Sequence, residues 1–213
     1  MARFNKDIGF TALHVEGGLL PPEFLQAVSR LEAKGQTNAD YHLTRSQQLK
    51  DEIGRYWRMA CDLWTEYKER RERQDLDIHQ VTVKDWLVPL FEDVLGYHDM
   101  TPTGSGTVGE RRFPIDFHAA GRTVPLVLTT ANHELDRAAA PFGDEGRRRS
   151  PHGLVQEYLN AATGCLWGIV ANGRQMRLLR DNPSLTRPAY IEADLERVRL
   201  FFYDGGLPKI NKL

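Results

Sequence analysis

Residues 165–180 read CLWGIVANGRQMRLLR, in which the pair Asn172-Gly173 separates two apolar runs. Asn-Gly is a favoured pair for the two-residue turn of a β-hairpin, so this stretch predicts strands over 165–171 and 174–180. Counting outward from the turn gives three cross-strand pairs, the first two on one face and the third on the other: Ile169 with Met176, Trp167 with Leu178, and Leu166 with Leu179. Both faces are apolar, which indicates that other elements cover the hairpin on each side.

The segments around this hairpin predict more strands and a helix packed against them. Ser150-Pro151 begins a helix, since serine is a preferred N-cap and proline suits the first turn, and Gly164 ends it. Residues 112–117 and 123–129 read as two strands, the second almost continuously apolar, and residues 190–195 read as a further strand.

Helical patterns precede this sheet. Pro21-Pro22 begins one helix, and Gly35 ends it in the position where glycine accepts a left-handed backbone. A Thr-x-x-Gln capping box, formed by Thr44 and Gln47, begins a longer helix. Its apolar residues recur in steps of three and four, which indicates a core-facing stripe rather than a base-stacking surface.

A third helix is predicted from Thr82, which is followed three residues later by Asp85, to Gly96. Pro89 lies inside this pattern and is expected to kink the helix or to mark its real beginning. The charged segment 69–77 joins this helix to the preceding one.

Together these patterns predict an α/β (α+β) protein. We expect N-terminal helices followed by a mixed β-sheet flanked by helices. The chain divides into an N-terminal helical region at residues 1–80, an α/β domain at residues 81–196 and a C-terminal tail at residues 197–213.

Composition excludes several classes of protein. The chain has 213 residues, 41% of them hydrophobic and 9% aromatic, and a formal net charge of −1, which does not fit a disordered chain. Its two cysteines exclude a disulfide scaffold. No stretch approaches the ~20 apolar residues that cross a bilayer, and residues 1–10 lack the apolar core of a signal peptide. We therefore expect a cytoplasmic protein without a membrane partner.

Because the net charge of the chain is close to zero, any surface that binds nucleic acid must be a local basic patch. Residues 137–149 are predicted to form a loop that ends in three arginines, and span 145–190 carries seven arginines against three acidic residues. From this basic span we select six candidate DNA contacts: Arg147, Arg148, Arg149, Arg174, Arg177 and Arg180.

The order of helix, acidic strand, apolar strand and helix is that of a metal-dependent nuclease core. Such a core needs an aspartate on one strand and Glu-x-Lys on the next, to hold Mg²⁺ and to stabilise charge on phosphate. Asp116 could supply the first, but residues 124–130 read VPLVLTT, without an acid or a lysine. Glu134 and Asp136 follow later, off the strand. We therefore predict no catalytic residues and no metal ligands, with Asp116, Glu134 and Asp136 as weak candidates.

Six stretches carry a family resemblance: GGLLPPEFL at 17–25, DYHLT at 40–44, WLVPLFEDVLGY at 86–97, FPIDF at 113–117, SPHGLVQEYLN at 150–160 and LWGIVANGRQMRLLRDNPSLTRPAYIEADLE at 166–196. They resemble the N-terminal region of adenine-specific DNA methyltransferases of restriction-modification and related phage-defence systems, including the single-chain Type IIG class. In Type IIG members the corresponding region is similar to a PD-(D/E)xK nuclease, and a helical connector, a methyltransferase domain and a target-recognition domain follow it.

The resemblance implies that residues 81–196 form a degenerate nuclease-like domain with a restriction-endonuclease-like arrangement. It also implies that the chain is either excised from a longer protein or a natural short product. Its partners would be DNA and the methyltransferase domain or subunit of the same system. Three hypotheses follow: a non-catalytic module that binds and positions DNA, a structural domain that docks on methyltransferase domains, and an Mg²⁺-dependent DNA endonuclease. No cofactor is expected, except Mg²⁺ under the third hypothesis.

Overall fold

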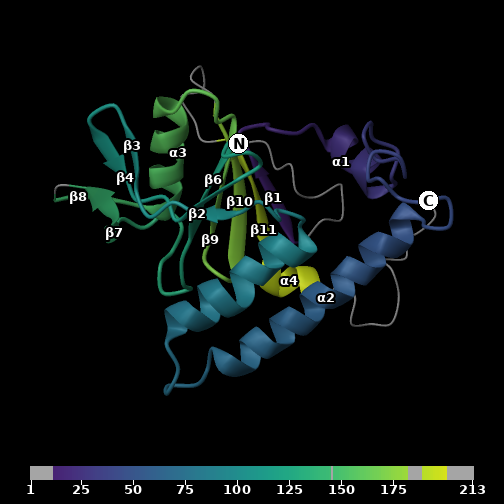
Figure 1. Ribbon diagram of the computed structural model, residues 1–213, viewed down its shortest axis with the longest axis horizontal. Coiled ribbons are helices and arrows are strands. Elements are labelled where there is room, and N and C mark those ends of the chain that lie inside the picture. The colour runs from purple at the N-terminus through teal and green to yellow at the C-terminus, as the bar shows by residue number, and fades with distance from the viewer. Residues whose placement is uncertain (1–11, 145, 182–188, 201–213) are drawn as a thin grey trace.

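The computed structural model of the chain describes residues 12–144, 146–181 and 189–200, and a mixed seven-stranded sheet lies at its centre (Figure 1). The sheet order is β1-β11-β10-β9-β6-β5-β2. Its strands are β1 (Leu13–Glu16), β2 (Thr101–Pro102), β5 (Phe117–Ala119), β6 (Val124–Leu128), β9 (Trp167–Ala171), β10 (Gln175–Arg180) and β11 (Tyr190–Asp194). Strands β6 and β9 are parallel, and the other neighbours are antiparallel. The predicted α+β class is confirmed.

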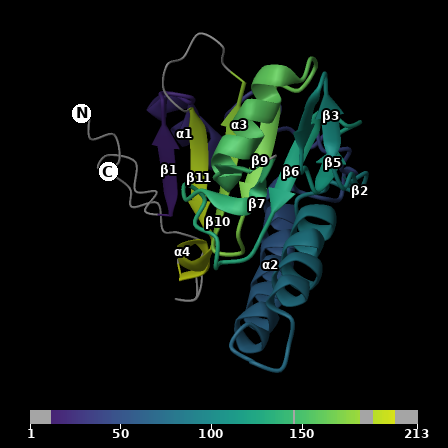
Figure 2. The ribbon, with the colours of Figure 1, turned by 90° about the vertical axis from the view of Figure 1, so that its left-hand side faces the viewer.

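Helices lie on both faces of this sheet (Figure 2). The helical segments of the described chain are α1 (Pro22–Ser29), α2 (Leu49–Arg70), the π-helical segments η1 (Gln80–Leu87) and η2 (Leu90–Val94), α3 (Pro151–Ala161) and α4 (Leu195–Leu200). Helix α3 lies in the connection between the parallel strands β6 and β9, as a crossover requires, and packs on one face. Helix α2 and the π-helical segments pack on the other.

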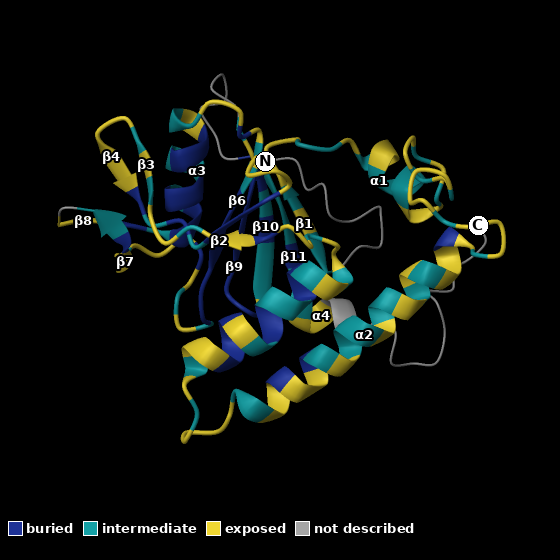
Figure 3. Cartoon of the chain, in the orientation of Figure 1, coloured by how far each residue is buried: buried dark blue, intermediate teal, exposed yellow. Residues whose placement is uncertain are grey.

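The core consists of two apolar clusters, one on each face of the sheet, because strand side chains alternate between the faces. Leu126 of β6 and Ile169 of β9 belong to the cluster under α2, η1 and η2, whereas Val127 and Val170 belong to the cluster under α3. Figure 3 shows the buried residues gathered on these central strands and on α3. The prediction that the hairpin is covered on both sides is confirmed.

The β9–β10 hairpin forms where predicted, but its register differs by two residues. Leu178, rather than Met176, lies opposite Ile169. The turn is centred on Gly173 and Arg174, with Gly173 at φ 84°, and Asn172 precedes it. A shift of two leaves every side chain on its predicted face, because the strand period is also two.

The side chain of Asn172 accounts for the displaced turn. Its Oδ1 accepts hydrogen bonds from the backbone N–H groups of Arg174 (3.1 Å) and Gln175 (2.9 Å). Its Nδ2 donates to the carbonyl of His133, 3.0 Å away. These bonds hold Asn172 as the residue between the end of β9 and the turn, rather than as a central residue of the turn.

The first two helices differ from prediction at their ends. Helix α1 ends at Ser29 rather than near Gly35, and Gln36 Nε2 donates to the Val28 carbonyl at 3.1 Å. Helix α2 begins at Leu49, because the Thr44–Gln47 contact closes a separate turn before it. The side chain of Asn38 instead accepts from the Leu49 N–H at 3.1 Å.

The third helix begins before the predicted Thr82, which is buried inside it. Asp77 accepts from the His79 N–H through its side chain (2.9 Å) and from the Val81 N–H through its carbonyl (3.0 Å). Pro89 lies between η1 and η2 with helical dihedral angles, so the helix does not begin there. Both segments have the wider i→i+5 hydrogen bonds that often accompany a disturbed α-helical ladder.

Two small hairpins replace the predicted loop at 137–149 and the first half of the predicted strand at 112–117. They are β3 (Gly106–Val108) with β4 (Arg111–Phe113), and β7 (Ala139–Asp144) with β8 (Arg147–Arg149). Pro114, which has no N–H for a ladder, follows β4 and separates it from β5. Figure 1 shows both hairpins on the side of α3 that faces away from α2.

A short hydrogen-bond chain fixes the beginning of the β3–β4 hairpin to α3. Thr103 Oγ1 lies 2.6 Å from His118 Nδ1, and His118 Nε2 lies 3.0 Å from the Tyr158 hydroxyl of α3. His118 is buried, and this burial lowers its pKa.

The predicted division at residue 80 stays a prediction. Trp64 and Tyr67 of α2 share a core cluster with Val81, and β1 pairs with β11. Residues 201–213 of the predicted tail lie outside the described residues.

We predict that Gly173→Ala destabilises the fold more than Gly96→Ala does. Both glycines have a positive φ, 84° and 80°, so each alanine costs about 1–2 kcal/mol of backbone strain. A Cβ at Gly173 would also lie 2.6 Å from Thr82 Cγ2 and 2.8 Å from the Tyr67 hydroxyl, whereas Gly96 has nothing within 4 Å. This overpacking adds about 1–3 kcal/mol, measurable by urea unfolding of both variants. Equal losses of unfolding free energy in the two variants would contradict the packing of the turn against α2 and η1.

Candidate nucleic-acid interface

Asp116 lies between the end of β6 and the π-helical segment η1. Its Oδ2 accepts from the N–H of Leu128 at 2.9 Å. Burial raises the pKa of Asp116 to about 6, although that hydrogen bond and the charges of His79 and Lys84 act in the opposite direction. The cations beside this carboxyl thus come from the helical segment and not from β6, where the sequence pattern would place a lysine.

The three carboxylates that the sequence suggested do not meet. The strand end opposite Asp116 carries Thr129, whose Oγ1 lies 2.8 Å from His133 Nδ1. Glu134 is exposed in the following segment, and Asp136 pairs with Arg177. Within residues 12–144, 146–181 and 189–200, no group of three His, Cys, Asp or Glu side chains could hold a metal ion.

Arg177 is buried on the α3 face of the sheet and forms ion pairs with the exposed Asp136 and the partly buried Glu192. Both its Nη atoms donate to Asp136, at 2.6 and 2.7 Å, and its Nε donates to Glu192. Its guanidinium also lies over the ring of Tyr190, 4.4 Å from the centroid. Burial alone would lower the pKa of Arg177, but the bonds to Asp136 and Glu192 outweigh it and raise the pKa. His152 Nδ1 lies 3.2 Å away, and burial together with this cation lowers the pKa of His152 to about 4.

Arg174, which directly precedes β10, and Arg180, its last residue, are both exposed. The six residue steps from one to the other span about 20 Å of extended chain. Arg174 lies in the turn packed against η1, where Trp86 Nε1 donates to the Gly173 carbonyl at 3.1 Å. The guanidinium of Arg180 lies 5.5 Å from the ring centroid of Trp167. The six candidate arginines therefore lie on separate parts of the fold, and Arg177 has no free face for a phosphate.

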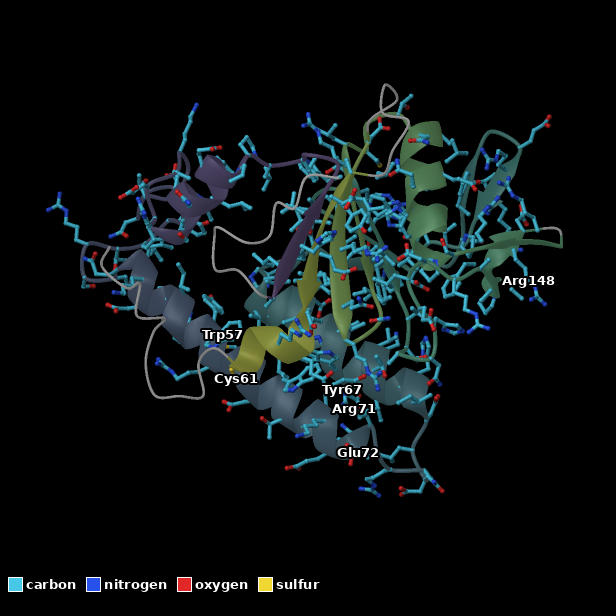
Figure 4. All side chains as sticks on the ribbon, turned by 180° about the vertical axis from the view of Figure 1, so that it is seen from behind. Trp57, Cys61, Tyr67, Arg71, Glu72 and Arg148 are labelled. Carbon is cyan, nitrogen blue, oxygen red and sulfur yellow. The ribbon has the colours of Figure 1, made fainter. Side chains whose placement is uncertain are left out.

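The remaining candidates lie on the two small hairpins, which we call the arginine lobe (β3, β4, β7 and β8). Strand β8 reads RRR and strand β4 reads RRF. In each, the first two residues are exposed and the third is buried. The lobe thus adds Arg111 and Arg112, which the sequence analysis did not select. Figure 4 shows Arg148 at the far end of the molecule from Trp57 and Cys61 of α2.

Three arginines of the lobe converge on one carboxylate of α3. Glu157 Oε2 accepts from Arg111 Nη2 at 2.6 Å, and Glu157 Oε1 accepts from Arg147 Nη2 at 3.1 Å. Arg149 Nε lies 3.2 Å from Oε2. A pocket of about 400 Å³ opens there, lined by Arg111, Arg147, Glu157, Asn160 and Ala161. The arrangement concentrates positive charge at a surface where an anion can enter.

Comparison of the chain with protein-family models, with curated proteins and with solved structures finds no match. None of the described helices is long and apolar enough to span a membrane.

We predict that Asp116→Asn weakens the pH dependence of stability. A carboxyl whose pKa rises from 3.8 to about 6 on folding stabilises the fold in its protonated form, and this contribution is lost as the pH rises through 6. The loss amounts to about 2–3 kcal/mol between about pH 4 and pH 7. Asparagine keeps an acceptor for the Leu128 N–H, so the variant should lack most of this loss. Urea unfolding of both proteins across this pH range measures the difference. If the unfolding free energies of the two proteins change with pH in the same way, the raised pKa of Asp116 is contradicted.

We also predict that Arg177→Ala destabilises the fold by about 3 kcal/mol, because it leaves the largely buried carboxylate of Glu192 without its partner. The matched change Arg174→Ala, at an exposed position of the neighbouring turn, should stay within about 0.5 kcal/mol. Thermal unfolding of the two variants distinguishes a structural Arg177 from a surface one.

Proposed function

We propose that this chain is a non-catalytic module that binds duplex DNA and positions it for a methyltransferase domain or subunit of a restriction-modification-type phage-defence system in the bacterial cytoplasm. The observation that carries the proposal is the arginine lobe. Five arginines lie on strands β4 and β8, four of them exposed. They belong to a protein whose net charge is only −1, so the basic surface is local.

The chemistry of the lobe supports a polyanionic partner. Guanidinium groups match phosphate oxygens in pairs and carry their charge at every physiological pH. Two-stranded ribbons are narrow enough to enter the major groove of DNA, and several DNA-binding proteins use strands in this way. Phosphate contacts would give affinity with little sequence preference, which suits a positioning role.

The surroundings of Asp116 support the absence of catalysis. The carboxyl has a raised pKa and accepts the Leu128 N–H, and β6 ends at Leu128 and is followed by Thr129 and Thr130. A water-activating Mg²⁺ site of this kind needs a second carboxylate and an ammonium on that strand. Lys84 supplies a cation near Asp116, but the second carboxylate is lacking among the described neighbours.

The methyltransferase partner rests on the family resemblance of the sequence. The stretch 166–196, the most specific of the six, spans β9, β10 and β11. These are three adjacent strands of the seven in the central sheet, so the resemblance concerns the scaffold that carries α3 and, through Glu157, the lobe.

We predict salt-dependent binding of the chain to a duplex of about 30 base pairs, measured by fluorescence anisotropy between about 50 and 200 mM salt. The double variant Arg147→Ala, Arg148→Ala should weaken binding to unrelated duplexes to a similar degree. The slope of log K against log salt should fall by about 0.9 for each phosphate that the variant no longer neutralises. The control Arg58→Ala removes an equal charge per site from the exposed side of α2 and should leave the slope unchanged.

Two other outcomes would each replace the proposed function with another hypothesis. If the chain does not bind duplex DNA at low salt, its partner is a protein and the structural-domain hypothesis replaces this one. If it cleaves DNA in Mg²⁺ and Asp116→Ala abolishes the cleavage, the endonuclease hypothesis replaces it.

A further inference from the structure

We propose that the pocket between the arginine lobe and α3 is a site for one backbone phosphate of duplex DNA, and that Glu157 competes with this phosphate for Arg111 and Arg147. The inference rests on the proposed function, which it deepens by naming the contact point and an internal competitor. Neither Arg111 nor Glu157 was among the residues that the sequence analysis selected.

The first argument is the balance of charge. Three guanidinium groups, from Arg111, Arg147 and Arg149, lie against the single carboxylate of Glu157. Among the side chains that meet at Glu157, three positive charges face one negative charge, an excess of two within this cluster. Such an excess attracts an anion, and the side chains of Arg111 and Arg147 are exposed enough, at 49% and 65%, to reach one.

The second argument is a deficit of hydrogen-bond acceptors, which is independent of the charge count. Arg149 is 6% exposed, and its Nε and Nη1 are buried without a hydrogen-bond partner among the described residues. The short distance from Nε to Glu157 Oε2 lacks the geometry of a hydrogen bond. Glu157 thus accepts hydrogen bonds from Arg111 and Arg147 and leaves Arg149 without one. A phosphate that takes over Arg111 and Arg147 would leave Glu157 free to turn toward Arg149.

The third argument is the direction of the side chains. In β8, Arg147 and Arg149 face Glu157. Arg148 lies between them in the sequence and therefore faces the other side of the ribbon. In β4, Arg111 faces Glu157 and Arg112 is the alternate residue. The two hairpins touch along β4 and β7. The lobe thus presents arginines on both of its sides, which suits a ribbon that contacts the two strands bordering a groove.

Glu157 also prepares the site. It holds Arg111 and Arg147 together before DNA arrives, which reduces the side-chain entropy lost on binding. The same carboxylate must give up these arginines, or share them, when a phosphate enters. A carboxylate in this role weakens non-specific affinity, and a positioning module needs to release DNA after each methylation.

The test measures duplex binding by Glu157→Gln and Glu110→Gln, which remove the same charge from two sites of the same region. Glu110 is exposed in the β3–β4 turn and does not line the pocket. We expect Glu157→Gln to bind duplex DNA about three- to tenfold more tightly at about 50 mM salt, and Glu110→Gln to change the affinity less than twofold. Arg111→Ala should weaken binding, lower the salt slope by about 0.9 and cancel the gain of Glu157→Gln in the double variant.

The outcomes separate the inference from the function on which it rests. If the unmodified chain does not bind duplex DNA, both fail. If it binds, but Glu157→Gln behaves like Glu110→Gln or weakens binding, the phosphate site fails and the proposed function stands. Equal affinity for a single strand of the same length would also overturn the duplex site. Arg111→Lys, which keeps the charge but not the planar fork, should bind between the unmodified chain and Arg111→Ala.

Discussion

The close approach of α3 to the backbone of β9 is the contact on which the rest of the structure depends. A Cβ at Gly168 would lie 2.6 Å from Val155 Cγ1 and 3.3 Å from Leu159 Cδ1, so the helix rests directly on a strand position without a side chain. This depth lets Leu154, Val155 and Leu159 become almost completely buried. It also fixes which residues α3 presents at its edges. Glu157 reaches the arginine lobe, and His152 reaches Arg177.

Local patterns in the sequence predicted those features that neighbouring residues determine. Ser150 caps α3 through a 3.0 Å bond from the Gly153 N–H, and the β9–β10 hairpin carries its apolar residues on the two predicted faces. The errors occur where a distant partner decides. The turn moves because Asn172, whose Oδ1 accepts from the turn itself, also donates to the carbonyl of His133. Helix α2 begins late because Asn38 caps it. The spacing of residues in the sequence does not reveal that His133 and Asn38 are the partners. The restriction-endonuclease-like arrangement stays a prediction, although the α+β class is confirmed.

The candidate site illustrates the same limit. A run of arginines reads as one basic patch, yet tertiary contacts give its members different roles. Arg177 pairs with Asp136 and Glu192, 41 and 15 residues away in sequence, and is a structural residue. For residues 147–149 a usable signal existed. Had they been read as a strand, the period of two would have placed Arg147 and Arg149 on one side and Arg148 on the other. Glycines and small residues at 137–149 concealed that strand.

Both hairpins of the lobe are insertions in connections of the main sheet. Hairpin β3–β4 lies between β2 and β5, and hairpin β7–β8 lies between β6 and α3. None of the four strands of these hairpins belongs to the seven-stranded sheet. Mutations in the lobe therefore spare the hydrogen bonds that build the scaffold, and natural selection can alter the chemistry of this surface while the architecture beneath it persists. Such a division lets the binding surface on the hairpins change in sequence while the central sheet keeps its fold.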